Sequence, residues 1–72
     1  MKYLNTDKLI QVGDKVILAN SPGRIVFVIE DDSYSPSYPK TVWEHLTRGF
    51  GVELENGDLF HFHLPDEDLE PI

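Results

Sequence analysis

The sequence predicts a mainly β domain, folded as a small, strongly bent antiparallel barrel of five strands with one short helix. Short runs of β-branched and aromatic residues separated by tight-turn signals are typical of such folds. The strongest run, residues 25–29, is apolar at every position, which favours a strand covered on both faces or bent across a barrel. With 72 residues, the chain has room for one domain, which we place at 1–72.

The first two strands are predicted on either side of the sequence SPGR. A β-rich run from Lys15 to Asn20 follows a Gly-Asp turn. Pro22 and Gly23 then stand where a type II turn needs them, because proline fixes φ at the second turn position and glycine accepts a positive φ at the third. Alternation along the second strand predicts one shared face for Ile25, Phe27 and Ile29.

The sequence TVWEHLTRG predicts a two-turn helix over residues 41–49. Thr41 and Glu44 have the spacing of a capping box, and Gly49 stands where a glycine commonly ends a helix. Trp43 and Leu46 would then point the same way, toward the core.

The dipeptide Asn56-Gly57 predicts a hairpin closed by a two-residue type I′ turn. This turn would pair Leu54 with Leu59 and Val52 with His61. After the hairpin, the sequence DEDLEPI predicts a tight turn and a short terminal strand.

The opening sequence VGDKV and the closing sequence DLEPI resemble the first and last strands of SH3-like barrels, which typically lie side by side. The order GRIVFVIEDDSYSPSYP, WEHLTRGFGVELENG and DEDLE resembles a family of uncharacterised small bacterial proteins with an SH3-like barrel fold. The resemblance covers about residues 12–72 and rests on Gly23, Tyr34, Tyr38, Pro39, Trp43, Leu46, Gly49, Glu53, His61, Asp66, Glu67, Asp68 and Leu69. It implies a fold and no established activity.

The chain is acidic, with 13 Asp and Glu against 6 Lys and Arg and a formal net charge of −7. Such a charge repels nucleic-acid phosphates and favours basic partners, although plain solubility also explains it. The chain has no cysteine, no signal-peptide pattern and no apolar run of membrane-spanning length, so we expect a cytoplasmic protein that binds neither nucleic acid nor membrane.

The sequence HFHLPDED offers a candidate metal site. His61 and His63 would share one face of a strand, and a carboxylate from Asp66, Asp68 or Glu70 would complete a set of two histidines and one carboxylate. In the predicted register, however, both histidines have apolar neighbours. We therefore expect partly buried histidines that form hydrogen bonds, with no metal and no other cofactor.

The sequence carries no recognisable catalytic motif. Its four serines fall in turns or in the loop, with no base at a meaningful spacing. Its five glycines each have an explanation as a turn, cap or bulge. We expect a protein that is not an enzyme.

The loop DDSYSPSYPK is the strongest candidate for a binding element. Tyr34 and Tyr38 are amphipathic anchors of the kind that dominate protein interfaces. The alternative is that Tyr38 folds inward as a lid over Trp43 while Tyr34 points outward. The two interpretations are compatible.

Acidic residues at the start of the loop and near the C-terminal end could complement a basic or mixed protein surface. The predicted partner-binding residues are Tyr34, Tyr38, Asp31, Asp32, Asp66, Glu67 and Asp68. Two functions follow: a protein-binding module, or an immunity-type inhibitor that neutralises a basic bacterial toxin. A subunit that stabilises a larger assembly is a third possibility.

Overall fold

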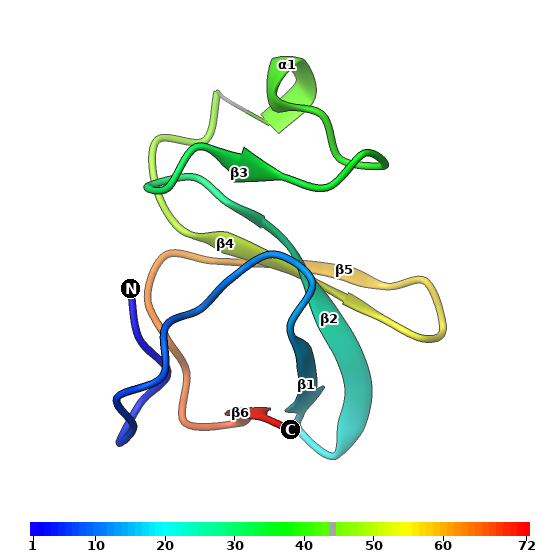
Figure 1. The fold of residues 1–72 in the computed structure, drawn as a ribbon. Coiled ribbons are helices and arrows are strands. Elements are labelled where there is room, and N and C mark those ends of the chain that lie inside the picture. The colour runs from blue at the N-terminus through cyan, green and yellow to red at the C-terminus, as the bar shows by residue number, and fades with distance from the viewer. Residues whose placement is uncertain (44) are drawn as a thin grey trace.

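The structure, a computed structural model, describes residues 1–43 and 45–72, without the side chain of residue 42. Figure 1 shows its elements in chain order. They are β1 (Lys15–Leu18), β2 (Ser21–Val28), β3 (Ser33–Tyr34), α1 (Lys40–Trp43), β4 (Phe50–Leu54), β5 (Leu59–Phe62) and β6 (Leu69–Pro71).

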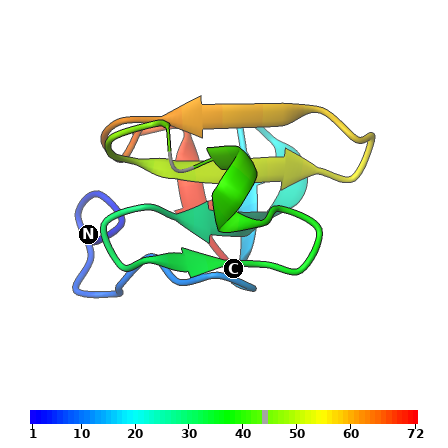
Figure 2. The same cartoon turned by 90° about the horizontal axis from the view of Figure 1, so that it is seen from above.

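The strands form one antiparallel sheet in the order β5-β4-β2-β1-β6, with β3 paired to β2 off this path. Figure 1 shows β2 curving from the bottom of the molecule, beside β1, to the level of β3 and β4. The mainly β class is confirmed, and β1 pairs with β6, as the resemblance of the end sequences to SH3-like barrels implied. The predicted number of strands is wrong, because β3 makes a sixth strand inside the expected loop. Among the described residues the sheet does not close: β5 and β6 end the path, and the short β3 is a further edge strand. Figure 2 shows β5 at the outer edge, beside β4.

The hairpin between β1 and β2 turns three residues earlier than predicted, at residues 19 and 20 instead of 22 and 23. Ala19 and Asn20 both have positive φ, 48° and 70°, and Leu18 pairs with Ser21 across them. Positive φ at both central residues is the type I′ geometry, whose twist matches that of the flanking strands. The predicted type II turn at SPGR is therefore wrong, and Pro22 lies within β2.

A β-bulge interrupts β2 between Ile25 and Phe27. Ile25 and Val28 both join the main core, which could not happen in a strand of strict alternation. The bulge sends Phe27 to the opposite, outer face of the sheet, so the predicted shared face for Ile25 and Phe27 is wrong.

The hairpin between β4 and β5 differs by one residue from the predicted register. Leu54 N–H donates to the carbonyl of Asp58 at 2.8 Å, and Gly57 N–H donates to the carbonyl of Leu54 at 2.9 Å. The loop thus has three residues, a type I turn followed by Gly57 at φ 95°. Val52 pairs with Phe60 instead of His61.

The helix α1 is a single turn and not the two turns predicted. Thr41 lies inside it, so Thr41 is not an N-cap, and the predicted capping-box partner Glu44 lies outside the described residues. Gly49 does have a positive φ, 106°, but it precedes β4 and does not end a helix. In the described part of the chain no helix is long and apolar enough to cross a membrane.

The main core lies on the inner face of the bent sheet. Its buried members are Tyr3, Ile10, Val16, Leu18, Ile25, Val28, Phe50, Val52, Leu54 and Leu69. Tyr3 and Ile10 come from an N-terminal segment for which the sequence predicted no role. A bridge between Lys2 and Leu9 shapes this segment, and the Tyr3 hydroxyl donates to Asp14 Oδ2 at 2.8 Å. The N-terminal segment therefore supplies part of the core of a small domain.

Candidate functional site

A row of residues crosses the outer face of the sheet from β5 to β3. His61 pairs with Gly51, Gly51 with Phe27, and Phe27 with Tyr34. Phe27 is fully buried, with its ring centroid 6.3 Å from that of Tyr34 and 6.2 Å from that of His61. The row exists because the bulge in β2 turns Phe27 outward and the observed hairpin register brings His61 opposite Gly51.

Gly51 makes room for this row. A Cβ built on Gly51 would lie 2.6 Å from Cζ of Phe27, a distance that real Cβ atoms essentially never show. The Phe27 ring thus lies across the backbone of β4, in space that any other residue at position 51 would fill.

The loop after β3 folds onto the row and adds two more rings. The Trp43 ring stacks on Phe27 with centroids 5.2 Å apart, and the Tyr38 ring lies 5.9 Å from Trp43 and 6.4 Å from Phe27. We call Phe27, Tyr34, Tyr38, Trp43 and His61 the aromatic platform. Apart from Phe27, its members are partly buried and reach the surface. Tyr38 contacts Trp43, as the lid interpretation expected, but it does so on the outer face of the sheet. Tyr34, which was expected to point outward, stacks on Phe27.

A polar chain runs from the aromatic platform along the outer face. The Tyr38 hydroxyl donates to Oε2 of Glu53, and Arg24 donates to Oε1 of Glu53 at 3.3 Å. The hydrogen bond to Glu53, burial and the charge of Glu53 raise the pKa of Tyr38 above its ordinary value, although Arg24 acts in the opposite direction. Tyr38 is therefore held as a neutral donor, and its loop is fastened to β4.

His61, considered above as a metal ligand, forms a hydrogen bond with the protein backbone instead. Its Nε2 lies 2.9 Å from the backbone carbonyl of Arg48 and its ring meets that of His63 edge-on at 4.9 Å. Nε2 is thus the protonated nitrogen that donates to this carbonyl. Within the described residues, no three His, Cys, Asp or Glu side chains are grouped to hold a metal.

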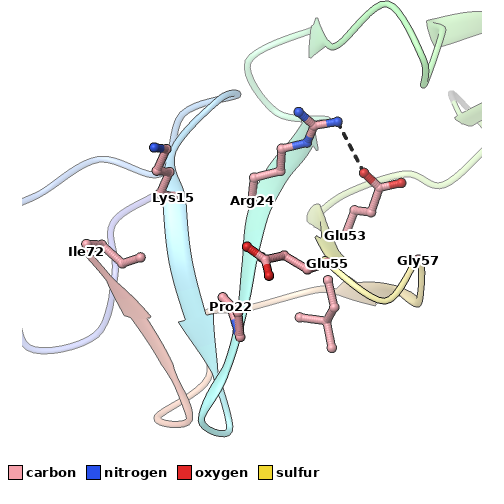
Figure 3. A pocket seen from close by; sticks show the side chains of 9 residues that line it. Lys15, Pro22, Arg24, Glu53, Glu55, Gly57 and Ile72 are labelled. Carbon is pink, nitrogen blue, oxygen red and sulfur yellow. Dashed lines mark hydrogen bonds and ion pairs between the residues drawn. The ribbon is translucent and has the colours of Figure 1, made fainter.

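An open groove of about 480 Å³ continues the outer face beyond Glu53. It is lined by apolar and charged side chains together, including Lys15, Pro22, Arg24, Glu53, Leu54, Glu55 and Ile72. Figure 3 shows Lys15 and Arg24 side by side on β1 and β2, with the carboxylate of Glu53 directed toward Arg24. Since Glu53 belongs both to the groove and to the polar chain, the aromatic platform and the groove form one continuous surface.

Two of the predicted acidic residues lie at the base of the loop. Asp32 forms an ion pair with Lys40 at 2.8 Å, which ties the start of the loop to α1. Asp31 is exposed, and its carbonyl accepts a hydrogen bond from the Ser33 hydroxyl at 3.2 Å. The negative charge of Asp32 is therefore partly neutralised by a residue of the same chain.

The other predicted acidic residues lie in a separate place, on the segment that leads into β6 (Figure 1). Asp66 Oδ1 accepts the backbone N–H of Asp68 at 3.2 Å, and the carbonyl of Asp68 accepts the N–H of Ala19 at 2.9 Å. Glu67 is exposed. Asp66 and Asp68 also line a second pocket, of about 330 Å³. The structure thus brings Tyr34 and Tyr38 together but divides the acidic residues between two regions.

Sequence reasoning missed the roles of Phe27, Glu53 and His61 in this surface. The outer position of Glu53 could have been predicted from the sequence. Glu53 stands between Val52 and Leu54 in a strand, so its side chain lies on the face opposite to theirs. The orientation of Phe27 could not have been predicted in this way, because it depends on the bulge in β2.

No family model, no curated protein and no solved structure matched the chain. The resemblance to small bacterial proteins with an SH3-like barrel therefore stays a prediction.

Proposed function

We propose that this chain is a non-catalytic protein-binding module, built on an SH3-like open barrel, that recognises a protein partner through its Tyr/Pro loop. The observation that carries this proposal is the aromatic platform, in which Tyr34, Tyr38 and Trp43 stack around Phe27 and still reach the surface. Partly exposed, rigid aromatic rings are the side chains that most often dominate binding energy at protein interfaces.

The platform prepares the loop for binding. Pro36, Ser37 and Pro39 are exposed in the loop that carries Tyr38, while the ion pair of Asp32 with Lys40 holds the two ends of the loop together. A loop that is ordered before binding loses less conformational entropy when it meets a partner. An exposed loop tip on a fixed base is therefore well suited to recognition.

The groove beside the platform favours an extended or broad ligand. It is open and carries both signs of charge, with Lys15 and Arg24 near Glu53 and Glu55. A protein segment that offers apolar contacts and charges of both signs would match this lining. Asp31 and Asp32 at the base of the loop favour a partner with basic character.

Contacts within the groove also support a binding role rather than catalysis. Glu53 is engaged by both Arg24 and Tyr38, so its carboxylate already has hydrogen-bond partners. A general base or nucleophile needs a free position facing the substrate. The polar chain instead positions the loop.

A second candidate function is an immunity-type inhibitor of a basic toxin. The net charge of −7 and the placement of Asp66 and Asp68 beside an apolar pocket favour it. Association with a basic toxin would be steered by charge and would slow as salt is raised.

The loop proposal is tested by adding a charged, bulky side chain at the exposed tip. Once a partner has been captured from the native host and purified, its affinity is measured for wild type, Ser37→Arg and the matched control Gln11→Arg. Gln11 is an exposed residue of the N-terminal segment. We expect Ser37→Arg to lose about thirtyfold in affinity with an unchanged melting temperature, and Gln11→Arg to bind as wild type. Equal binding by all three would refute the loop as the recognition element.

A further inference from the structure

The edge of the sheet at β5 carries a second surface of a different chemical character. The sheet does not close between β5 and β6 in the described part of the chain, and a pocket of about 330 Å³ lies there. We call it the seam pocket. Its principal lining residues are Leu18, Leu54, Phe60, Phe62, Asp66 and Asp68.

Apolar side chains make up most of the pocket, and one of them is left open to water. Phe60, in the middle of β5, is 42% exposed, whereas Phe62 stacks on the buried ring of Phe50 with centroids 5.5 Å apart. A large apolar ring exposed beside a pocket is a common feature of surfaces that receive a partner.

The backbone of β5 is open along the same side. Among the described residues β4 is its one strand neighbour. Leu54 and Asp58 form a hydrogen-bonded pair, and such pairs alternate along an antiparallel ladder. The backbone N–H and C=O groups of Phe60 and Phe62 therefore point toward β4. Those of Leu59 and His61 point away from β4, to the open side. Such an edge can accept an added strand.

The carboxylates of the seam pocket lack a cationic partner. Within the described residues neither Asp66 nor Asp68 forms an ion pair, and the one side-chain hydrogen bond between them uses a backbone N–H. Two carboxylates beside an apolar pocket match a side chain that combines an apolar stem with a positive end, which describes lysine and arginine.

We propose that the seam pocket receives a lysine or arginine side chain from an extended segment of a protein partner, and that this segment pairs with the free edge of β5. A second copy of this chain is a poorer occupant, because two copies would each carry a net charge of −7 and would bring like carboxylates together. The inference rests on the proposed binding role and deepens it, but it does not depend on the Tyr/Pro loop.

The test uses a synthetic peptide as the probe, acetyl-Thr-Val-Lys-Val-Thr-amide, titrated into the isotope-labelled chain and followed by amide NMR shifts. We expect saturable shifts at the amides of Leu59 and His61. The same peptide with norleucine in place of lysine should bind about tenfold more weakly, because it keeps the stem and loses the charge. Both peptides are titrated into the wild-type chain, so the comparison does not depend on whether a variant folds.

Charge-removing variants locate the cation. Asp66→Asn with Asp68→Asn should weaken the lysine peptide about tenfold, while the matched pair Asp31→Asn with Asp32→Asn, which removes the same charge elsewhere, should change it by less than about twofold. Three outcomes would overturn the proposal: no saturable shift at about 1 mM peptide, equal weakening by both pairs, or self-association of the chain that blocks the peptide. Ser37→Arg should not change peptide binding, so the two surfaces can fail separately.

Discussion

Phe27 and Gly51 face each other across β2 and β4, and the ring of Phe27 fills the space that a side chain at position 51 would need. Two features make this pairing possible: the bulge that turns Phe27 outward and the absence of a Cβ at position 51. The aromatic platform, and with it the position of the loop, depends on this one cross-strand pair.

We predict that Gly51→Ala lowers the free energy of unfolding by about 2 kcal/mol, because the added Cβ forces the Phe27 ring off its position. Denaturant unfolding measures the loss. In a Phe27→Leu background the same substitution should cost at least about 1 kcal/mol less, since the smaller side chain leaves room. An equal cost in both backgrounds would show that the strain does not come from the ring.

The three-residue loop of the second hairpin predicts an asymmetric response to substitution. Gly57 has φ 95° and no atom within 4 Å of a built Cβ, so the cost of a larger residue there is conformational and not steric. Gly57→Val should destabilise the chain by about 1 kcal/mol or more, whereas Asp58→Asn should stay within about 0.5 kcal/mol. Thermal unfolding of both variants decides, and equally mild effects would contradict the positive φ at Gly57.

Trp43 belongs to the aromatic platform and is partly buried, whereas the sequence placed it in the main core. We expect Trp43→Ala to cost about 2 kcal/mol, below the range for a fully buried tryptophan. Wild-type fluorescence should be blue-shifted relative to free tryptophan and should move to longer wavelength in Phe27→Leu. An emission maximum typical of full exposure would rule out the stacked arrangement.

We predict that the free energy of unfolding falls at alkaline pH because of Tyr3. Burial first, and then its hydrogen bond to Asp14 and the nearby charge, raise the pKa of Tyr3 well above its ordinary value of 10.0. Because the folded chain holds this proton more tightly than the unfolded chain, the associated stability is complete below the ordinary pKa and falls as pH rises above it.

Urea unfolding of wild type and Tyr3→Phe, measured from about pH 8 to pH 11, tests this linkage. At about pH 8, Tyr3→Phe should be less stable than wild type by about 1 kcal/mol, and its stability should depend less on pH above 10.0. Parallel curves for the two proteins would mean that other groups cause the alkaline loss.

Much of the fold could be predicted from local signals. The β-rich runs predicted five of the six strands, and the resemblance of the two end sequences to SH3-like barrels implied the pairing of β1 with β6. The hairpin register was missed because Asn56-Gly57 also suits a type I turn followed by a glycine of positive φ. The hydrophobic pattern of the two strands could have predicted the correct register. Of the two registers, only the observed one places five apolar side chains on one face: Phe50, Val52, Leu54, Phe60 and Phe62.

The candidate surface was harder to predict than the fold. Tyr34 and Tyr38 stood out by composition, but their support depends on Phe27, whose direction is set by a bulge that the run of residues 25–29 does not reveal. The N-terminal segment was missed for a similar reason: Tyr3 and Ile10 are separated by mostly polar residues and meet the core through a tertiary contact, without a periodic pattern.

The proposed function requires that the loop over the aromatic platform contacts a protein partner. Site-specific photo-crosslinking in the native host tests it most directly, with a photoreactive benzoylphenylalanine in place of Ser37 at the loop tip, or in place of Gln11 as the control. Both positions are exposed, and neither side chain belongs to the core or the platform. We predict one discrete crosslinked protein from position 37 that is absent from position 11. Crosslinking of the same protein from position 11 alone, or from neither position, would contradict the claim.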